Sequence, residues 1–461
     1  MNTSNKIPYR FFWTWDHSTN WILNVPGEQI TGVCNPYAKE APLFEQDYKR
    51  AIDWCADHKM TGIGIVGMLR DRHGGVDAAR RVCSYAREKG ILVYLIAGLF
   101  AYGGIYYEGD HKYSLNRFFE KNPDAIAKAP DGSNVAVKYK GRYGVKDELQ
   151  GCASNPFLHE FILESLDWLF RVIPELGGIQ MESTDNGVCS CPACLKRRGV
   201  ASLEEPISLA DMAAIYPDAS ETIRRVNPDA LIICETYHHF LDKECSIFAD
   251  KTPSPDLKKL LAMPETTFWQ WKCDQMLKDG EWRVGDEMIE NMKRFRHIIR
   301  AHSGTQWWGG RNTFAVDNIR RQCLLSQSSG IDSVSMFGET SPYHSNIEFN
   351  YLALEYFADD PKRTNADFII DIMADRLGGK SNAEAYYEYA YLFRKDYTKI
   401  PSAVLDIAKI MASLSDYDAI RRFNYLSHYL NTYYWELSRG TEMSTMIPRD
   451  SDRFDLTQKV I

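Results

Sequence analysis

The sequence lacks a long hydrophobic run and lacks blocks of like charge. No apolar stretch approaches the roughly 18 residues of a membrane-spanning helix, so no membrane partner is expected. The formal net charge is −8 without a run of one sign, which argues against nucleic acid as a partner. The opening "MNTSNKIPYR" has no apolar signal core. We therefore expect a cytoplasmic protein, or a secreted or periplasmic one whose signal peptide has been removed.

A disulfide framework is also missing. The 11 cysteines are an odd number, and several lie inside apolar runs, which favours reduced thiols. Cys189, Cys191 and Cys194 form a C-x-C-x-x-C motif that offers three thiolates to a structural zinc ion. The sequence holds no second C-x-x-C to supply a fourth. A short-loop disulfide or packed thiols are the alternatives, and no cofactor or catalytic metal is predicted.

What the chain does contain is a repeated alternation of apolar runs and amphipathic segments. The runs are continuous, as in a parallel sheet buried on both faces. Helical patterns lie between them, including one over 285–304. The predicted strands are 9–15, 61–67, 91–99, 177–183, 230–236, 266–272, 304–310 and 331–339.

Eight such strands predict a (β/α)8 TIM barrel of class α/β. A doubly wound open sheet is the alternative, but "GIGIVGMLRDRHGG" lacks its G-x-G-x-x-G turn. We assign 1–345 to the barrel, with a long insertion at 100–160 after the third strand. Residues 346–461 read as a C-terminal helical extension packed on the barrel. Its "YYEYAYLF" segment suggests exposed aromatic surface and a homodimer.

Acidic residues follow several of the predicted strands. Asp16 ends the first, Glu182 and Asp185 the fourth, Glu235 the fifth and Glu339 the eighth. Strand ends of a barrel meet at one face, where active sites are built. Paired carboxylates supply the acid and the base or nucleophile of glycoside hydrolysis. Tryptophans near these ends suit a sugar ligand.

Other residues have both an ordinary and a functional interpretation. His111, in the insertion, is either a surface histidine or a general base or acid above the pocket. Arg70, Arg72 and Arg142 are surface cations or ligands of a substrate carboxylate.

The motifs resemble those of a known group. "GCASNPFLHEFILESLDWL" followed by "GGIQMESTDNGVCSCPAC" is similar to TIM-barrel glycoside hydrolases, and "FWTWDHS" most resembles the inverting sialidases of glycoside hydrolase family 156. That resemblance implies exo-cleavage of a terminal acidic sugar, most of all sialic acid, by an activated water. It implies that Asp16 and His111 carry the acid–base work, that arginines hold the sugar carboxylate, and that the protein is a homodimer.

The resulting assignments fall into two sets. The predicted catalytic residues are Asp16, His111, Glu182 and Glu339. The predicted substrate-binding residues are His17, Arg142, Asp185, Glu235, Trp271, Trp308 and Asn346.

Three alternatives stay open. The first is a retaining uronidase or hexosaminidase that uses Glu182 and Glu339. The second is a carbohydrate-binding barrel without catalysis. The third is a metal-dependent enzyme, hinted at only by His238 and His239 beside Glu235.

Overall fold

The structure is a computed structural model of the chain. It describes residues 6–15, 41–141, 144–183, 188–199, 209–235, 255–272, 277–278, 281–282, 294–301, 314–338 and 347–439.

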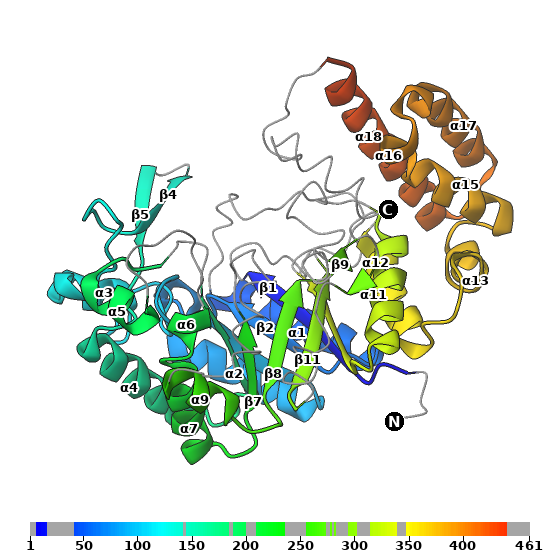
Figure 1. Cartoon of the computed structure of the whole chain (residues 1–461). Helices are drawn as coiled ribbons and strands as arrows, with labels where there is room; N and C mark the ends of the chain where they lie inside the picture. The colour runs from blue at the N-terminus through cyan, green and yellow to red at the C-terminus, as the bar shows by residue number, and fades with distance from the viewer. Residues whose placement is uncertain are drawn as a thin grey trace.

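Eight parallel strands close into a barrel, which confirms the predicted fold class. The order around the barrel is β1-β12-β11-β8-β7-β6-β3-β2. In Figure 1 the arrows of β7, β8 and β11 point the same way, toward the end of the barrel where the β4–β5 hairpin also lies. The strands are β1 (Tyr9–Trp15), β2 (Gly62–Val66), β3 (Leu92–Gly98), β6 (Gly178–Glu182), β7 (Leu231–Glu235), β8 (Phe268–Lys272), β11 (Arg296–Ala301) and β12 (Ser333–Phe337).

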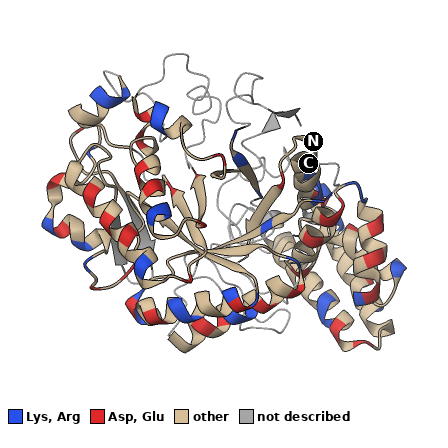
Figure 2. Cartoon of the chain, turned by 90° about the horizontal axis from the view of Figure 1, so that it is seen from below, with Lys and Arg blue, Asp and Glu red and all other residues tan. Residues whose placement is uncertain are grey.

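Helices surround these strands. Figure 2 shows charges of both signs mixed along the helices, while the central strands are mostly uncharged. None of the described helices combines the length and the apolar character needed to cross a bilayer. The helices around the barrel are α1 (Ala41–Asp57), α2 (Gly75–Glu88), α4 (Pro156–Val172), α6 (Leu209–Met212), α7 (Tyr216–Val226), α9 (Pro255–Leu261), α11 (Val316–Ser328) and α12 (Ile347–Asp359).

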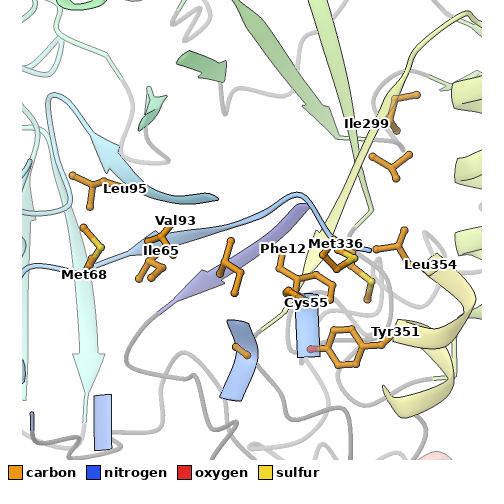
Figure 3. Close-up of a cluster of buried hydrophobic side chains, with 14 of the residues drawn as sticks. Phe12, Cys55, Ile65, Met68, Val93, Leu95, Ile299, Met336, Tyr351 and Leu354 are labelled. Carbon is orange, nitrogen blue, oxygen red and sulfur yellow. The ribbon is translucent and has the colours of Figure 1, made fainter. Parts of the chain in front are cut away.

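Alternation along each strand produces two hydrophobic layers. One set of side chains fills the barrel interior, including Phe11, Ile96 and Ile298. The other set faces the helices and forms the larger core, including Phe12 and Met336. Figure 3 shows part of this outer core, where Tyr351 and Leu354 of α12 lie beside the strands. Burial on both faces explains why the strands read as continuous apolar runs.

The seventh strand was predicted in the wrong place. It is β11, at Arg296–Ala301, inside the segment predicted as a helix over 285–304. The predicted strand at 304–310 lies outside the described residues. Phe295, Ile298 and Ile299 are spaced as on a helix face, which explains the error. In the strand, Ile298 and Arg300 are two residues apart and therefore share one face. That face is the barrel interior, where Ile298 packs and Arg300 pairs with Glu235.

α4 begins at Pro156, directly after its N-cap residue Asn155. The Asn155 side chain accepts a hydrogen bond from the Leu158 backbone N–H at 3.0 Å, and Pro156 occupies the first turn. A side-chain acceptor satisfies one unpaired N–H of the first turn, and proline suits a position that needs no donor.

The insertion after β3 carries α3 (Leu115–Lys121) and a hairpin of β4 (Ala136–Gly141) and β5 (Gly144–Leu149). Arg70 and Arg72, which follow β2, both form ion pairs with Glu108 of the insertion, the Arg70 pair at 2.7 Å. These arginines therefore fasten the insertion to the barrel. Beyond β6 the chain forms α5 (Pro192–Arg198), and β9 (Leu277–Lys278) pairs with β10 (Glu281–Trp282) beyond β8.

The C-terminal region begins with α12, which packs on β1. The Tyr351 ring lies 5.0 Å from the Phe12 ring, and the Ile7 N–H donates to the Ala358 carbonyl. The following helices lie to one side of the barrel in Figure 1. These helices are α13 (Asn365–Phe368), α14 (Ala374–Arg376), α15 (Lys380–Ala390), α16 (Leu392–Lys395), α17 (Ile400–Ser413) and α18 (Tyr417–Arg439).

The "YYEYAYLF" segment, which was expected to expose aromatic surface, has two buried and two half-buried tyrosines. Tyr386 and Tyr391 are buried, and Tyr386 packs against Phe349 and Phe423. This segment joins the helical region to α12.

Candidate active site at the carboxyl ends of the strands

Two glutamates stand side by side at the carboxyl ends of neighbouring strands. Glu182 is the last residue of β6 and Glu235 the last residue of β7, and the two are paired in the strand register. Both side chains are fully buried. Gln180 on β6 donates from one nitrogen to both, at 2.8 Å to Glu182 Oε1 and 2.5 Å to Glu235 Oε2. The two predicted carboxylates are therefore close neighbours.

Two neutral groups of the described residues donate hydrogen bonds to Glu182. Besides Gln180, the Trp13 indole Nε1–H donates to Glu182 Oε1 at 3.2 Å. Trp13 lies on β1, three strands from β6 around the barrel, so this hydrogen bond crosses the barrel interior. A tryptophan that donates to a carboxylate fixes the side-chain rotamer of that acid.

Glu235 sits in a different electrostatic environment. Arg300 Nη2 on β11 lies 2.7 Å from Glu235 Oε1, and neither side chain is more than 1% exposed. Gln270 on β8 donates to Glu235 Oε2 at 2.8 Å. A guanidinium partner and two amide donors favour the ionised form of a buried carboxylate.

Aromatic rings enclose this polar group. Trp13 contacts Trp15 and Phe337 edge to face, with centroids 5.6 Å and 4.9 Å apart. Trp15, the last residue of β1, contacts Tyr102 of the insertion at 5.6 Å. Burial, together with the nearby Glu235 charge, raises the pKa of Tyr94, so its hydroxyl stays protonated. The acids thus lie in a largely dry, aromatic environment.

His111 lies elsewhere. Its ring stacks on Tyr106 with centroids 4.3 Å apart and lies 4.6 Å from the Trp168 ring of α4. Burial lowers its pKa, against an opposing effect from Asp71. The described contacts join His111 to α4 and to the base of the insertion, and they do not bring it to Glu182.

Trp271 is also not part of the interior group. It lies on β8 but faces the helices, where it is buried against Trp269 with centroids 6.1 Å apart. Its Nε1–H donates to His297 Nδ1 at 3.0 Å. Gln270, one residue earlier, faces the interior instead, as strand alternation requires.

The other predicted site residues lie outside the described residues. They are Asp16, His17, Arg142, Asp185, Trp308, Glu339 and Asn346, together with His238 and His239 of the metal-enzyme alternative.

Sequence reasoning missed the residues that hold the two glutamates. Gln180 and Gln270 are polar residues inside apolar strands, and Gln180 stands two residues before Glu182 on the same face. That period-two spacing was an available signal. Arg300 was hidden because its strand was read as a helix.

Two further features lie away from this group. A surface groove of about 910 Å³ runs along α4 and is lined by Trp168, Arg171 and Arg225, on the outside of the barrel. Among the described residues, one group of side chains is arranged as metal ligands are. It consists of Cys152, Cys189, Cys191 and Cys194. Neither feature contains Glu182 or Glu235.

No protein-family model matches this sequence, and no curated protein matches it. Solved structures do match its fold. A glycoside hydrolase family 138 enzyme that targets pectin rhamnogalacturonan II superposes with a TM-score of 0.56 at 11% identity over 93% of this chain and 58% of its own. A family 89 glycoside hydrolase from Clostridium perfringens, in complex with PUGNAc, gives 0.55 at 12% identity over 98% and 53%. This chain thus spans little more than half the length of these proteins, and the likeness is one of fold.

Proposed function

We propose that this protein is a glycoside hydrolase whose active site lies at the carboxyl ends of the barrel strands. The observation that carries the proposal is the pair of buried glutamates, Glu182 and Glu235, on neighbouring strand ends in an aromatic enclosure. Two solved glycoside hydrolases share the fold over nearly the whole chain. Charge buried at this face, away from water, suits catalysis better than packing.

In this proposal the two glutamates have different roles. Arg300 neutralises Glu235, which then serves as a fixed anion that orients Gln180 and Gln270. Glu182, held by Trp13 and Gln180, is the acid that exchanges a proton with the glycosidic oxygen or the water. In glycosidases, two carboxylates take different roles in acid–base chemistry because their environments differ.

The finer proposal concerns the substrate. We expect removal of a terminal acidic sugar, sialic acid first, with inversion and with Asp16 as partner of the acid–base chemistry. Its support is the resemblance of "FWTWDHS" to inverting sialidases, and Asp16 directly follows Trp15 of the aromatic enclosure.

The first experiment measures hydrolysis of aryl glycosides of sialic acid, glucuronic acid and N-acetylglucosamine. Rhamnogalacturonan II fragments join the panel because the structurally similar family 138 enzyme targets that polymer. Proton NMR then identifies the first-formed anomer. Sialic acid released with inversion supports the finer proposal. Retention supports the alternative that uses Glu182 and Glu339, and binding without turnover supports the carbohydrate-binding barrel.

Glu182→Gln tests the central residue. We expect kcat to fall by about 10²–10⁴-fold, the usual contribution of a general acid or base. The amide oxygen still accepts from Trp13 and Gln180, so the fold should persist. Glu164→Gln, on the groove outside the barrel, is the matched control and should keep full activity. Wild-type kcat in Glu182→Gln would refute the assignment.

Asp16→Asn separates the inverting proposal from its rivals. If Asp16 shares the acid–base work, this variant should lose nearly all turnover while its unfolding midpoint stays unchanged. A rise in KM alone would make Asp16 a ligand of a substrate hydroxyl instead. The measurement is steady-state kinetics on the substrate that the panel identifies.

A further inference from the structure

Four cysteine side chains meet at one point from separate parts of the chain. Cys152 precedes α4, Cys189 and Cys191 follow β6, and Cys194 lies in the first turn of α5. All four Sγ atoms lie within 4.8 Å of one another. Cys152, distant in sequence, supplies the fourth thiol that the C-x-C-x-x-C motif lacks.

The sulfur spacing matches that of ligands around one metal ion. Cys152 Sγ lies 3.7 Å from Cys191 Sγ and 3.6 Å from Cys194 Sγ. A disulfide would bring two sulfurs to about 2.0 Å. A zinc–sulfur bond of about 2.3 Å places tetrahedral ligands about 3.8 Å apart. The spacing therefore suits a single tetrahedral ion.

Backbone groups surround the sulfurs as they do around metal thiolates. The Lys128 and Cys191 N–H groups point at Cys189 Sγ, at 3.3 Å and 3.4 Å. Arg198 Nη1 donates to the Cys189 carbonyl at 2.8 Å. N–H donors and nearby cations stabilise the net negative charge of a four-thiolate site.

The cluster is enclosed. Cys152, Cys189 and Cys194 are buried, and Ala127 and Val135 of the insertion pack against them. Cys191 is partly exposed, so one of the four ligands is in contact with solvent. Four protein ligands leave no open position for water, which is the pattern of a structural site.

We propose that Cys152, Cys189, Cys191 and Cys194 bind one structural zinc ion. The ion ties the insertion after β3 to the segment that leaves β6 at Glu182. This inference is independent of the proposed glycosidase activity.

The test begins with elemental analysis of the wild-type protein, purified without added metal. We expect about one zinc ion per chain. Cobalt substitution should give the visible spectrum of a tetrahedral cobalt thiolate. Cys191→Ser and Cys152→Ser should lose the zinc, while Cys83→Ala, a buried cysteine of α2 outside the cluster, should keep it.

The proposal is overturned if the wild-type protein carries little or no zinc, or if its intact mass shows that these cysteines form disulfides. It is also overturned if Cys191→Ser retains full zinc content. Because the wild-type measurements need no variant, a variant that fails to fold does not weaken the test.

Discussion

Glu235 and Arg300 form an ion pair between two fully buried side chains. Removing both charges from water is costly, and their attraction offsets that cost only while both are present. Gln180 and Gln270 share the carboxylate, so the pair also sets the position of neighbouring polar groups. At the scale of single residues, stability and the proposed chemistry therefore depend on the same contacts.

Arg300→Met should lower the free energy of unfolding by about 3–5 kcal/mol, because it leaves Glu235 buried without its cation. Adding Glu235→Leu should restore much of that loss, since the double variant has no unpaired charge. Urea unfolding of both variants and of Glu235→Leu completes a double-mutant cycle. If the loss of unfolding free energy in the double variant equalled the sum of the losses in the two single variants, the two residues would not be coupled.

At the scale of elements, charged side chains join α12 to β1 and to the two residues that follow α1, and these charges range from buried Arg10 to exposed Lys59. Asp359 accepts from Arg10 at 2.5 Å and from Lys59 at 2.6 Å, and Glu355 pairs with His58 at 2.7 Å. Burial raises the pKa of Asp359, but Lys59 and Arg10 lower it by more, so it lies below its ordinary value. Burial also raises the pKa of Glu355, but His58 and Lys59 lower it by more, so it too lies below its ordinary value.

The lowered pKa of Asp359 gives its contribution to stability a defined pH window. As the pH falls, the Asp359 carboxyl takes up a proton at about pH 4 in the unfolded chain. In the folded protein it does so only at a lower pH. The contribution is therefore complete above about pH 4 and is lost as the pH falls through the folded pKa. Asp359→Asn should lower stability at neutral pH and flatten its decline in acid.

Urea unfolding at neutral pH and at about pH 3 measures this slope. Asp124→Asn, an exposed position in the insertion, serves as the control and should follow the wild type. An unchanged acid decline in Asp359→Asn would show that other carboxylates govern it.

At the scale of the whole molecule, the helical region and the barrel share a core through α12. Phe349 of α12 lies 5.3 Å from the Tyr386 ring of α15 and 6.1 Å from Phe314 before α11. Arg422 of α18 forms an ion pair with Glu348 of α12 at 2.8 Å. These contacts link the C-terminal helices to the helix that packs on β1.

Phe349→Ala should lower the free energy of unfolding by about 3–5 kcal/mol through the cavity it creates. Because both regions pack on α12, far-UV circular dichroism and tryptophan fluorescence should report one shifted transition. Two separated transitions would show that the helical region unfolds on its own. Phe157→Ala, an exposed phenylalanine on α4, is the control.

Homodimer formation stays a prediction, as does the placement of the protein in a cell compartment. Light scattering on the purified chain decides the first. The exposed Leu405, Tyr417 and Trp435 of α17 and α18 are the apolar side chains to mutate if a dimer is found.

The sequence by itself determined the barrel and the strand ends that carry Glu182 and Glu235. Strands buried on both faces must be apolar along their length, so an acid at their end is visible without a structure. The start of α4 at Asn155 and Pro156 is likewise a local feature, because a helix cap depends only on neighbours in the chain.

Only the tertiary structure decided which side chains meet. Gln180, Gln270 and Arg300 join the glutamates because closure brings β6, β7, β8 and β11 side by side, and Cys152 reaches the C-x-C-x-x-C segment across the insertion. Trp271 and Gln270 are neighbours in sequence, yet they face opposite layers of the barrel. Contacts between distant segments depend on register and closure, and no local pattern encodes these.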